Sequence, residues 1–376
     1  MKALLLIMCL VLHVSEGGSI GGAIDSARTV YKATGRHVTV LIEPGTYYEE
    51  LTIDVPFLTL KNAASKPGIG LLNGGVATDE GAVRISWYCG HGYQYRSMGG
   101  SFNYGGKRTR RWNATVLVTA QGFTAENIIF ENSFNQYVSP AELRDSLWDI
   151  SQADTDWTRN ERPKRLMLER PRREFSTEVQ KKPYIERAAA LSFVKGATDA
   201  RLVNCRCVGH QDVLYGDHGA EVTVEGGVVQ GTVDFIFGGM DLTVRNAQLV
   251  IGGDDGQQQC YIAAGRGFAG STNEQNTNYK GLELQAPDSI STAYGNVPAD
   301  EVAEQGMVFE NCSVRYATPD EVVNPAQPVV CFARPWRWWG RHLFVGTVCA
   351  PGLRLSGTPF NLGLTKGREA PWCEVR

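Results

Sequence analysis

Two aspartates, Asp212 and Asp234, have the types and spacing most suited to chemistry in this chain, and they lie 22 residues apart. Asp234 is flanked by Val233 and by the apolar run 235–237, where an ionisable group is costly unless it has partners or a task. In a chain that repeats about every twenty residues, the two carboxyl groups fall on neighbouring coils, about 4.8 Å apart. Such a pair can divide into an ionised nucleophile and a protonated acid. The spacing alone fits structural turn aspartates equally well.

The elements that must position these aspartates follow a recurring pattern: a short strand, a turn with Gly or Asn, and another short strand. The pattern occurs at residues 122–130, 200–208, 220–229, 240–250 and 306–314. Asn204, Gly227 and Asn246 occupy equivalent places, 23 and 19 residues apart. A period near twenty with β-structure throughout indicates a β-solenoid in which each coil stacks on the next. We therefore predict one elongated all-β domain.

Composition supports a folded domain and limits its partners. Of the 376 residues, 43% are hydrophobic and 20% are charged, which permits a sizeable core. The 42 glycines favour a turn-rich fold over a helical bundle. The formal net charge of -3 gives no overall attraction to nucleic acid or to an anionic membrane, and we expect neither as a partner.

The N-terminus resembles a signal peptide, because Lys2 precedes a short apolar run and small residues follow at Ser15, Gly17 and Gly18. The run is too short to span a bilayer. We predict a signal peptide over residues 1–17, a mature domain over 18–376, and a secreted, extracellular location. A buried first strand is the alternative interpretation.

Nine cysteines occur, of which Cys9 would leave with the signal peptide. The remaining eight are an even number, as in a secreted protein with disulfides, but their spacing predicts no pairing. Cys205 and Cys207 lie on the same face of a strand and fit buried free thiols at least as well as a bridge. Neither a Cys-x-x-Cys motif nor a zinc-like Cys/His spacing is present, so we predict no metal and no cofactor.

A long insertion, about residues 135–184, interrupts the repeat. Ser139 followed by Pro140 is a typical helix start. Residues 159–182 contain nine Lys or Arg and four Glu. This segment fits either a basic wall for a polyanionic sugar or a solvated loop, and long insertions in solenoids often emerge on the binding face.

Five short motifs, in order along the chain, resemble the signatures of the pectin methylesterase (pectinesterase) family of carbohydrate esterases. They are Gly45–Glu49, Arg187–Leu191, Gly209–Tyr215, Val233–Gly238 and Ala333–Trp336. The resemblance runs from about residue 20 to about residue 350. It implies a right-handed parallel β-helix of the pectin-lyase-like type, in agreement with the period, and hydrolysis of galacturonate methyl esters in pectin.

The resemblance also implies a role for each site residue. Asp234 would be the nucleophile that attacks the ester carbonyl, and Asp212 would protonate the departing methanol and then act as base toward water. Gln211 would donate its amide to the developing oxyanion. Arg334 would keep Asp234 ionised and oriented.

Substrate contacts are expected from a second group of residues. Trp336 would offer a flat face to a sugar ring, with Tyr215 and Phe237 at the rim, and Thr115 lies near the place of a substrate-contacting threonine. Arg187 departs from the family's usual Gln. It fits an oxyanion donor, a partner of Glu186, or a contact to the substrate carboxylate.

The function predicted from these residues is that of a monomeric pectinesterase acting on methyl-esterified homogalacturonan to release methanol and pectate. Two alternatives stay open. One is another polysaccharide-active β-helix enzyme, with a different ester, glycosidase or lyase activity. The other is a non-catalytic sugar-binding β-helix, against which Gln211, Asp212, Asp234 and Arg334 together argue.

Overall fold

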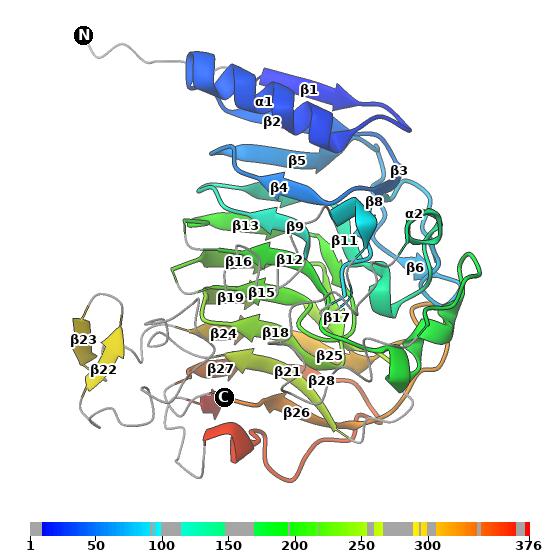
Figure 1. Ribbon diagram of the computed structural model, residues 1–376. Helices are drawn as coiled ribbons and strands as arrows, with labels where there is room; N and C mark the ends of the chain where they lie inside the picture. Colours follow the sequence, from blue (N-terminus) through cyan, green and yellow to red (C-terminus); the bar gives the residue numbers. More distant parts are fainter. Residues whose placement is uncertain are drawn as a thin grey trace.

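A stack of parallel coils forms the body of the molecule (Figure 1). The structure is a computed structural model that describes residues 10–90, 93, 95–98, 114–146, 169–194, 196–217, 219–253, 259–265, 289–292, 295–298, 306–336, 340–365 and 373–376. Within these residues, three parallel sheets of ten, eight and seven strands run along the stack. Each coil contributes one short strand to each sheet, which is the arrangement of a parallel β-helix.

Strands of successive coils are neighbours in each of the three sheets. The ten-stranded sheet contains, in spatial order, β1 (Leu10–Val14), β2 (Val38–Ile42), β5 (Leu58–Asn62), β10 (Thr124–Glu126), β13 (Ala200–Val203), β16 (Glu221–Glu225), β19 (Asp241–Arg245), β24 (Met307–Glu310), β27 (His342–Val345) and β29 (Cys373–Val375). The eight-stranded sheet contains β28 (Val348–Cys349), β25 (Ser313–Tyr316), β20 (Gln248–Ile251), β17 (Val228–Gly231), β14 (Arg206–Val208), β11 (Ile128–Asn132), β8 (Val83–Trp87) and β3 (Gly45–Tyr48). The seven-stranded sheet contains β26 (Val329–Ala333), β21 (Gln259–Gly265), β18 (Val233–Gly238), β15 (Leu214–Gly216), β12 (Ala189–Phe193), β9 (Ala114–Val118) and β4 (Leu51–Ile53).

Smaller elements decorate the stack. Two antiparallel hairpins are formed by β6 (Leu71–Leu72) with β7 (Ala77–Thr78), and by β22 (Ser289–Thr292) with β23 (Gly295–Pro298). The helices in the described part of the chain are α1 (Ile20–Thr34), α2 (Pro140–Arg144) and the 3-10 turns η1 (Arg96–Met98), η2 (Ser133–Asn135), η5 (Thr177–Gln180), η6 (Lys182–Tyr184) and η9 (Leu362–Thr365).

The register between strands confirms the predicted period. Arg201 pairs with Thr223, and Thr223 pairs with Thr243, which are steps of 22 and 20 residues. The turn between the first two strands of a coil holds Asn204, Gly227 and Asn246, all with positive φ, as their equivalent spacing predicted. Gly227 has no alternative there, because a Cβ would lie 2.0 Å from the Cys205 carbonyl oxygen.

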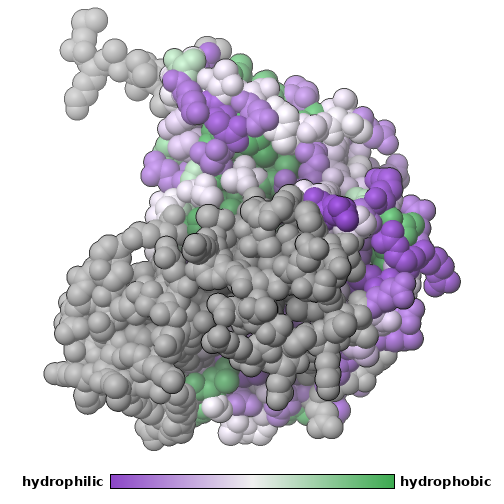
Figure 2. Space-filling model, in the orientation of Figure 1, coloured by the Kyte–Doolittle hydropathy of each residue, from purple (hydrophilic) through white to green (hydrophobic). Residues whose placement is uncertain are grey.

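On the surface that is described, hydrophilic and intermediate residues dominate, and hydrophobic ones are confined to small areas (Figure 2). The exposed large hydrophobic residues are scattered along the chain: Val11, Leu72, Phe175, Val323, Val348, Leu355, Leu362 and Val375. Among the described residues, no helix combines the length and the apolar character needed to cross a membrane.

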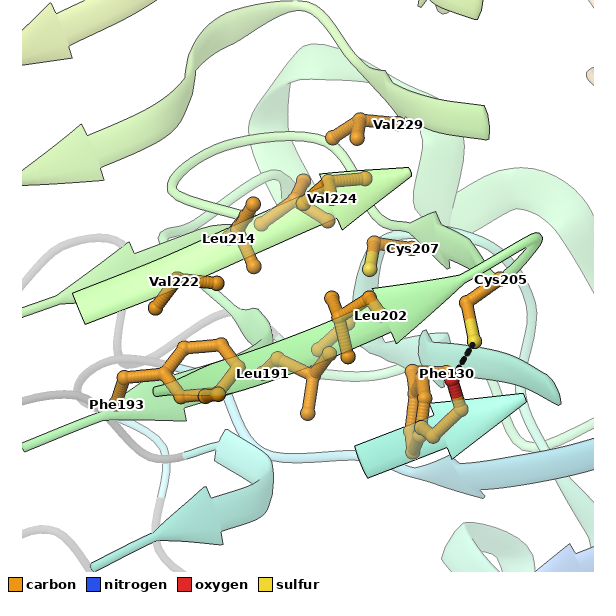
Figure 3. Packing of buried hydrophobic residues seen from close by; sticks show 14 of the residues in the cluster. Phe130, Leu191, Phe193, Leu202, Cys205, Cys207, Leu214, Val222, Val224 and Val229 are labelled. Carbon is orange, nitrogen blue, oxygen red and sulfur yellow. Dashed lines mark hydrogen bonds between the residues drawn. The ribbon is translucent and has the colours of Figure 1, made fainter. Parts of the chain in front are cut away.

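The interior is built from apolar residues that repeat from coil to coil. Leu202, Val224 and Val244 are aligned in consecutive strands of the ten-stranded sheet, and each is almost fully buried. Leu191 and Leu214 form a similar pair in the seven-stranded sheet (Figure 3). Burying one such side chain contributes roughly 2 kcal/mol, so stacking gives every coil a share of the core.

The cysteines contribute to this core as thiols. All eight cysteines in the described residues are free, and six of them are buried. Cys205 and Cys207 point into the interior, Cys205 near Phe130 and Cys207 near Leu202 (Figure 3), and the Cys205 thiol lies 3.4 Å from the Ala125 carbonyl oxygen. Burial raises the pKa of Cys205 to about 12. The two cysteines are therefore buried free thiols, one of the two predicted alternatives.

Helix α1 covers the N-terminal end of the stack and buries Ile20, Ile24 and Ala27 (Figure 1). Its first turn is held by Ser19, whose hydroxyl accepts a hydrogen bond from the Gly22 amide. Glu49 accepts hydrogen bonds from the Ile20 and Gly21 amides at 2.8 and 2.9 Å. The last residue of the first family-like motif therefore stabilises this helix N-terminus.

Residues 10–14, inside the predicted signal peptide, form strand β1 at the edge of the ten-stranded sheet. The pairing runs in register from Leu10 opposite Val38 to Val14 opposite Ile42. Residues 1–9 lie outside the described residues, so the signal peptide stays a prediction. Its removal would make β2 the edge strand.

The insertion begins with the predicted helix α2. The Ser139 hydroxyl accepts a hydrogen bond from the Glu142 amide at 3.0 Å, and Pro140 follows it, as expected for a helix start. Arg170, from the basic segment, is buried and pairs with Glu142, with 2.9 Å between Nε and Oε1. Arg170 therefore holds the basic segment of the insertion against α2. Residues 147–168 of the insertion lie outside the described part of the chain.

Candidate active site

The predicted carboxylate pair lies on two adjacent coils of the seven-stranded sheet. Gln211 pairs with Val233 and Leu214 pairs with Ile236, a constant step that sets Asp212 opposite Asp234. Neighbouring strands are about 4.8 Å apart, which agrees with the spacing argument from the sequence. The exposed fractions of Asp212 and Asp234 are 1% and 2%. Figure 1 shows β15 and β18 one above the other in the middle of the stack.

Both aspartates adopt an uncommon backbone conformation. Their φ angles are 58° and 47°, in the left-handed region that Asp tolerates better than most residues. The register between β18 and β21 slips between Val233 and Ile236, at the position of Asp234. Such a bulge redirects a side chain from the ordinary alternation of a strand. The sequence shows this only as an aspartate within an otherwise apolar run.

Arg334 binds Asp234 through two hydrogen bonds. Its Nε lies 3.0 Å from Oδ1, and Nη2 donates to Oδ2. Burial raises the pKa of Asp234, while the charge and hydrogen bonds of Arg334 oppose that rise. Although burial lowers the pKa of Arg334, the charge and hydrogen bonds of Asp234 raise it. Arg334 therefore offsets only part of the effect of burial, and the pKa of Asp234 stays above its ordinary value beside a second carboxyl group.

Arg187 and Gln211 are aligned on successive coils by a parallel bridge. The Ala188 amide donates to the Gln211 carbonyl oxygen at 3.1 Å, which fixes the two backbones together. The Arg187 guanidinium Nε lies 3.9 Å from Glu186 Oε1, at the outer limit of an ion pair. The side chain of Arg187 is 16% exposed. The structure thus brings Arg187 beside Gln211, and the role of Arg187 stays a prediction.

Three aromatic residues line up beside the carboxylates. Tyr215 pairs in register with Phe237, with ring centroids 5.6 Å apart and an angle of 24° between planes. Phe237 contacts Trp336 at 4.7 Å between centroids. Tyr215 and Phe237 are 2% and 1% exposed, whereas Trp336 is only partly buried. Their contact with a sugar stays a prediction.

Thr115 makes a hydrogen bond within the protein. The residue is fully buried in β9, and its hydroxyl donates to the Glu131 carbonyl oxygen at 2.6 Å. Because a hydroxyl has one proton to donate, that donor is already used within the protein. Substrate contact by Thr115 stays a prediction.

A known family matches the part of the chain that carries most of these residues. The pectinesterase family model matches residues 181–292. "Pectinesterase 4" of Arabidopsis thaliana is 27% identical over 161 residues, covering 42% of this chain and 21% of that protein. "Probable pectinesterase/pectinesterase inhibitor 58" of the same plant is 26% identical over 303 residues, covering 79% of this chain and 38% of that protein.

Solved pectin methylesterases share the fold with this chain. One, crystallised with a hexasaccharide, has a TM-score of 0.52 and 19% identity, covering 92% of this chain and 80% of that structure. The enzyme from Yersinia enterocolitica has a TM-score of 0.51 and 19% identity, covering 89% of this chain and 80% of that structure. This likeness confirms the predicted right-handed parallel β-helix. The chain spans 21% to 38% of the length of these curated plant relatives.

The pectinesterase segment holds most of the predicted site but not all of it. Arg187, Gln211, Asp212 and Asp234 lie within residues 181–292. Arg334 lies beyond this segment, and the coil that ends in β26 brings it back to Asp234. The fold therefore brings Arg334 into contact with a site whose other polar residues lie in residues 181–292.

Two buried asparagines that the sequence analysis did not predict support the backbone of the candidate site. Asn135 donates to the Glu186 carbonyl oxygen at 2.6 Å and accepts from the Glu186 amide at 3.0 Å. Asn132 donates to the Ala189 carbonyl oxygen at 3.0 Å. Together they fix the backbone on both sides of Arg187. In the sequence, the only available signal was two Asn residues directly after an apolar strand.

Proposed function

We propose that this chain is a pectin methylesterase that hydrolyses galacturonate methyl esters of homogalacturonan to methanol and pectate. The observation that carries the proposal is the bidentate contact of Arg334 with Asp234, opposite Asp212, within a pectinesterase family fold. A hydrolase that works through a carboxylate nucleophile needs one ionised and one neutral carboxyl group. Arg334 favours the ionised form of Asp234, and burial near a second carboxylate favours the neutral form of Asp212.

In the first step, an Asp234 oxygen attacks the ester carbonyl carbon, and the carbonyl oxygen takes up the negative charge. The Gln211 amide donates a hydrogen bond to this oxyanion, and Arg187 is the second candidate donor. When the intermediate collapses, the bond to the methoxy group breaks and Asp212 supplies its proton. Methanol leaves, and the galacturonyl group stays on Asp234 as an anhydride.

In the second step, Asp212 is ionised and accepts a proton from water. The hydroxide so formed attacks the same carbonyl carbon, and Asp234 departs as a carboxylate. Asp212 is then protonated again and ready for the next turnover. The two steps together consume one water for each methanol released. The groups of the protein that take part in them are side chains.

Substrate binding is assigned to the aromatic residues beside the pair. Trp336 is partly buried, and a flat indole suits the apolar face of a sugar ring. One solved pectin methylesterase carries a hexasaccharide, which supports an oligosaccharide as ligand for the shared fold.

We further propose that the enzyme is secreted and acts as a monomer. Mass spectrometry of the mature N-terminus and light scattering test these two points.

Methanol release from methyl-esterified polygalacturonate tests the function. We expect release by the wild-type protein, and a loss on the order of a thousandfold or more in Asp234→Asn, because the amide cannot serve as nucleophile. Asp241→Asn is the matched control, since Asp241 is an exposed strand aspartate outside the site. A folded Asp234→Asn protein with full activity would refute the mechanism. Cleavage of the uronate chain without methanol would assign the fold to a glycosidase or lyase instead.

A further inference from the structure

Tyr261 lies beneath the guanidinium of Arg334. The Arg334 Cζ atom is 4.2 Å from the centroid of the Tyr261 ring, well within the range of a cation–π contact. Tyr261 belongs to β21, whose register places it between Val233 of β18 and Cys331 of β26. The ring therefore occupies the coil between the one that carries Asp234 and the one that carries Arg334.

The position of Tyr261 explains how the Arg334 side chain is held across the intervening coil. The Arg334 amide is bound to the Ala263 carbonyl oxygen at 2.8 Å, at the far edge of β21 from Asp234. Its side chain must cross the intervening coil to reach a carboxylate two strand spacings away, about 10 Å. A free arginine side chain has many rotamers, and fixing them opposes the contact. A flat ring below the guanidinium holds it in the plane that two parallel hydrogen bonds require.

The Tyr261 ring is itself held by its hydroxyl. That hydroxyl donates to Gln259 Oε1 at 2.6 Å and accepts from Asn361 Nδ2 at 3.2 Å. Asn361 lies in the C-terminal segment, and its amide donates to the Ala333 carbonyl oxygen at 2.9 Å, directly before Arg334. The segment thus contacts both the backbone next to Arg334 and the ring under its guanidinium.

We propose that Tyr261 is a positioning residue for Arg334, and that Asn361 of the C-terminal segment fixes Tyr261 in turn. The proposal deepens the pectin methylesterase function proposed above and rests on Asp234 as its nucleophile. It assigns a role to residues after the last family-like motif, because residues 359–361 run beside β26 through the Phe332 and Ala333 amides. Tyr261 acts through Arg334 and makes no contact with the reacting atoms.

Removal of the ring should be visible in the pH profile. Within the described residues, the groups around Asp234 are Asp212 on the coil before it, Cys260 and Tyr261 on the coil after it, and Arg334. If the guanidinium is loosened, the ionised form of Asp234 loses support and its pKa rises further. The nucleophile is active only when ionised, so the acid limb of kcat/KM moves to higher pH.

The test compares Tyr261→Leu with Tyr261→Phe and with Tyr316→Leu. Tyr316 is the matched control, because it belongs to β25 of the eight-stranded sheet and its hydroxyl accepts a hydrogen bond from the Arg354 amide of the C-terminal segment at 3.0 Å. We expect Tyr261→Leu to lower kcat/KM about tenfold near neutral pH, the scale of a desolvated cation–π contact. Its acid limb should move up by about one pH unit. Tyr261→Phe keeps the ring and should retain most activity, and Tyr316→Leu should leave the acid limb unchanged.

Direct titration of Asp234 separates this proposal from the function. Carboxyl ¹³C NMR of the folded protein, with the Asp234 signal identified by its loss in Asp234→Asn, reports the pKa without turnover. A rise in Tyr261→Leu supports the positioning role even if no methanol is released, in which case only the function fails. If Tyr261→Leu does not fold, Asn361→Ala provides a second, milder variant. We expect it to raise the pKa of Asp234 by a smaller amount. An Asp234 titration unchanged in the folded variants would overturn the proposal.

Discussion

At the residue scale, Arg187 is the side chain whose role most affects the chemistry. The motif comparison predicts Gln at its position, and a parallel bridge aligns Arg187 with Gln211 on the next coil. An arginine offers five N–H donors and a permanent charge, so it can replace a glutamine as oxyanion donor. The 3.9 Å separation between Arg187 Nε and Glu186 Oε1 is too long to dominate its orientation.

For Arg187→Ala we expect kcat to fall about a hundredfold with KM nearly constant, since one oxyanion donor is lost while Gln211 remains. Arg187→Gln restores a neutral donor and should recover most of the rate. Both values come from initial rates of methanol release over a range of pectin concentrations. A rise in KM alone would assign Arg187 to the substrate carboxylate.

At the element scale, 3-10 turn η2 and the end of β11 carry the support of the site. Asn135, at the end of η2, satisfies both backbone groups of Glu186, a residue 51 positions later. This contact exists because the insertion leaves and re-enters the stack at neighbouring coils. No local sequence pattern reveals it, since a hydrogen bond between distant segments depends on the register that the fold imposes.

Asn135→Ala should lower the free energy of unfolding by about 2 kcal/mol, because it leaves the buried Glu186 amide and carbonyl groups without these bonds. It should also lower kcat, because the backbone that carries Arg187 is released. Urea unfolding and methanol release measure the two effects. Asn246→Gly is the control, since this exposed turn residue has a φ of 54° that glycine also adopts. Equal stability and activity in Asn135→Ala would show that η2 does not support the site.

At the scale of the whole molecule, the sequence predicted the stack and its carboxylate pair because both depend on a period. Asn204, Gly227 and Asn246 mark equivalent turns, and the same step of about twenty residues sets Asp212 opposite Asp234. The contact between Tyr261 and Arg334 could not be predicted from the period. From β20 to β25 the step grows to 65 residues, so the period is interrupted before the coil that carries Arg334.

Contacts across several coils also stabilise the stack, and Glu321 is the clearest case. Its carboxylate accepts hydrogen bonds from Arg206 of β14 at 2.6 Å and from Arg315 of β25 at 2.7 Å. These two strands are separated by β17 and β20. Although burial raises the pKa of Glu321, its hydrogen bonds with Arg315 and Arg206 lower it to about 2. Arg206 is buried, and the lowered pKa of its guanidinium reflects the cost of that burial.

Glu321→Gln should therefore lower the free energy of unfolding by about 3 kcal/mol at pH 7, the lower end for a broken buried ion pair because Arg315 is partly exposed. A depressed carboxyl pKa contributes stability above the unfolded value of about 4.3, and this contribution is lost as pH falls toward 2. The difference between wild type and Glu321→Gln in urea unfolding should be constant above about pH 5 and shrink below it. Glu374→Gln removes an exposed ion pair with Arg376 and should change neither the free energy of unfolding nor its dependence on pH. A difference that persists unchanged to pH 3 would mean that Glu321 stabilises the coils through packing and not through its charge.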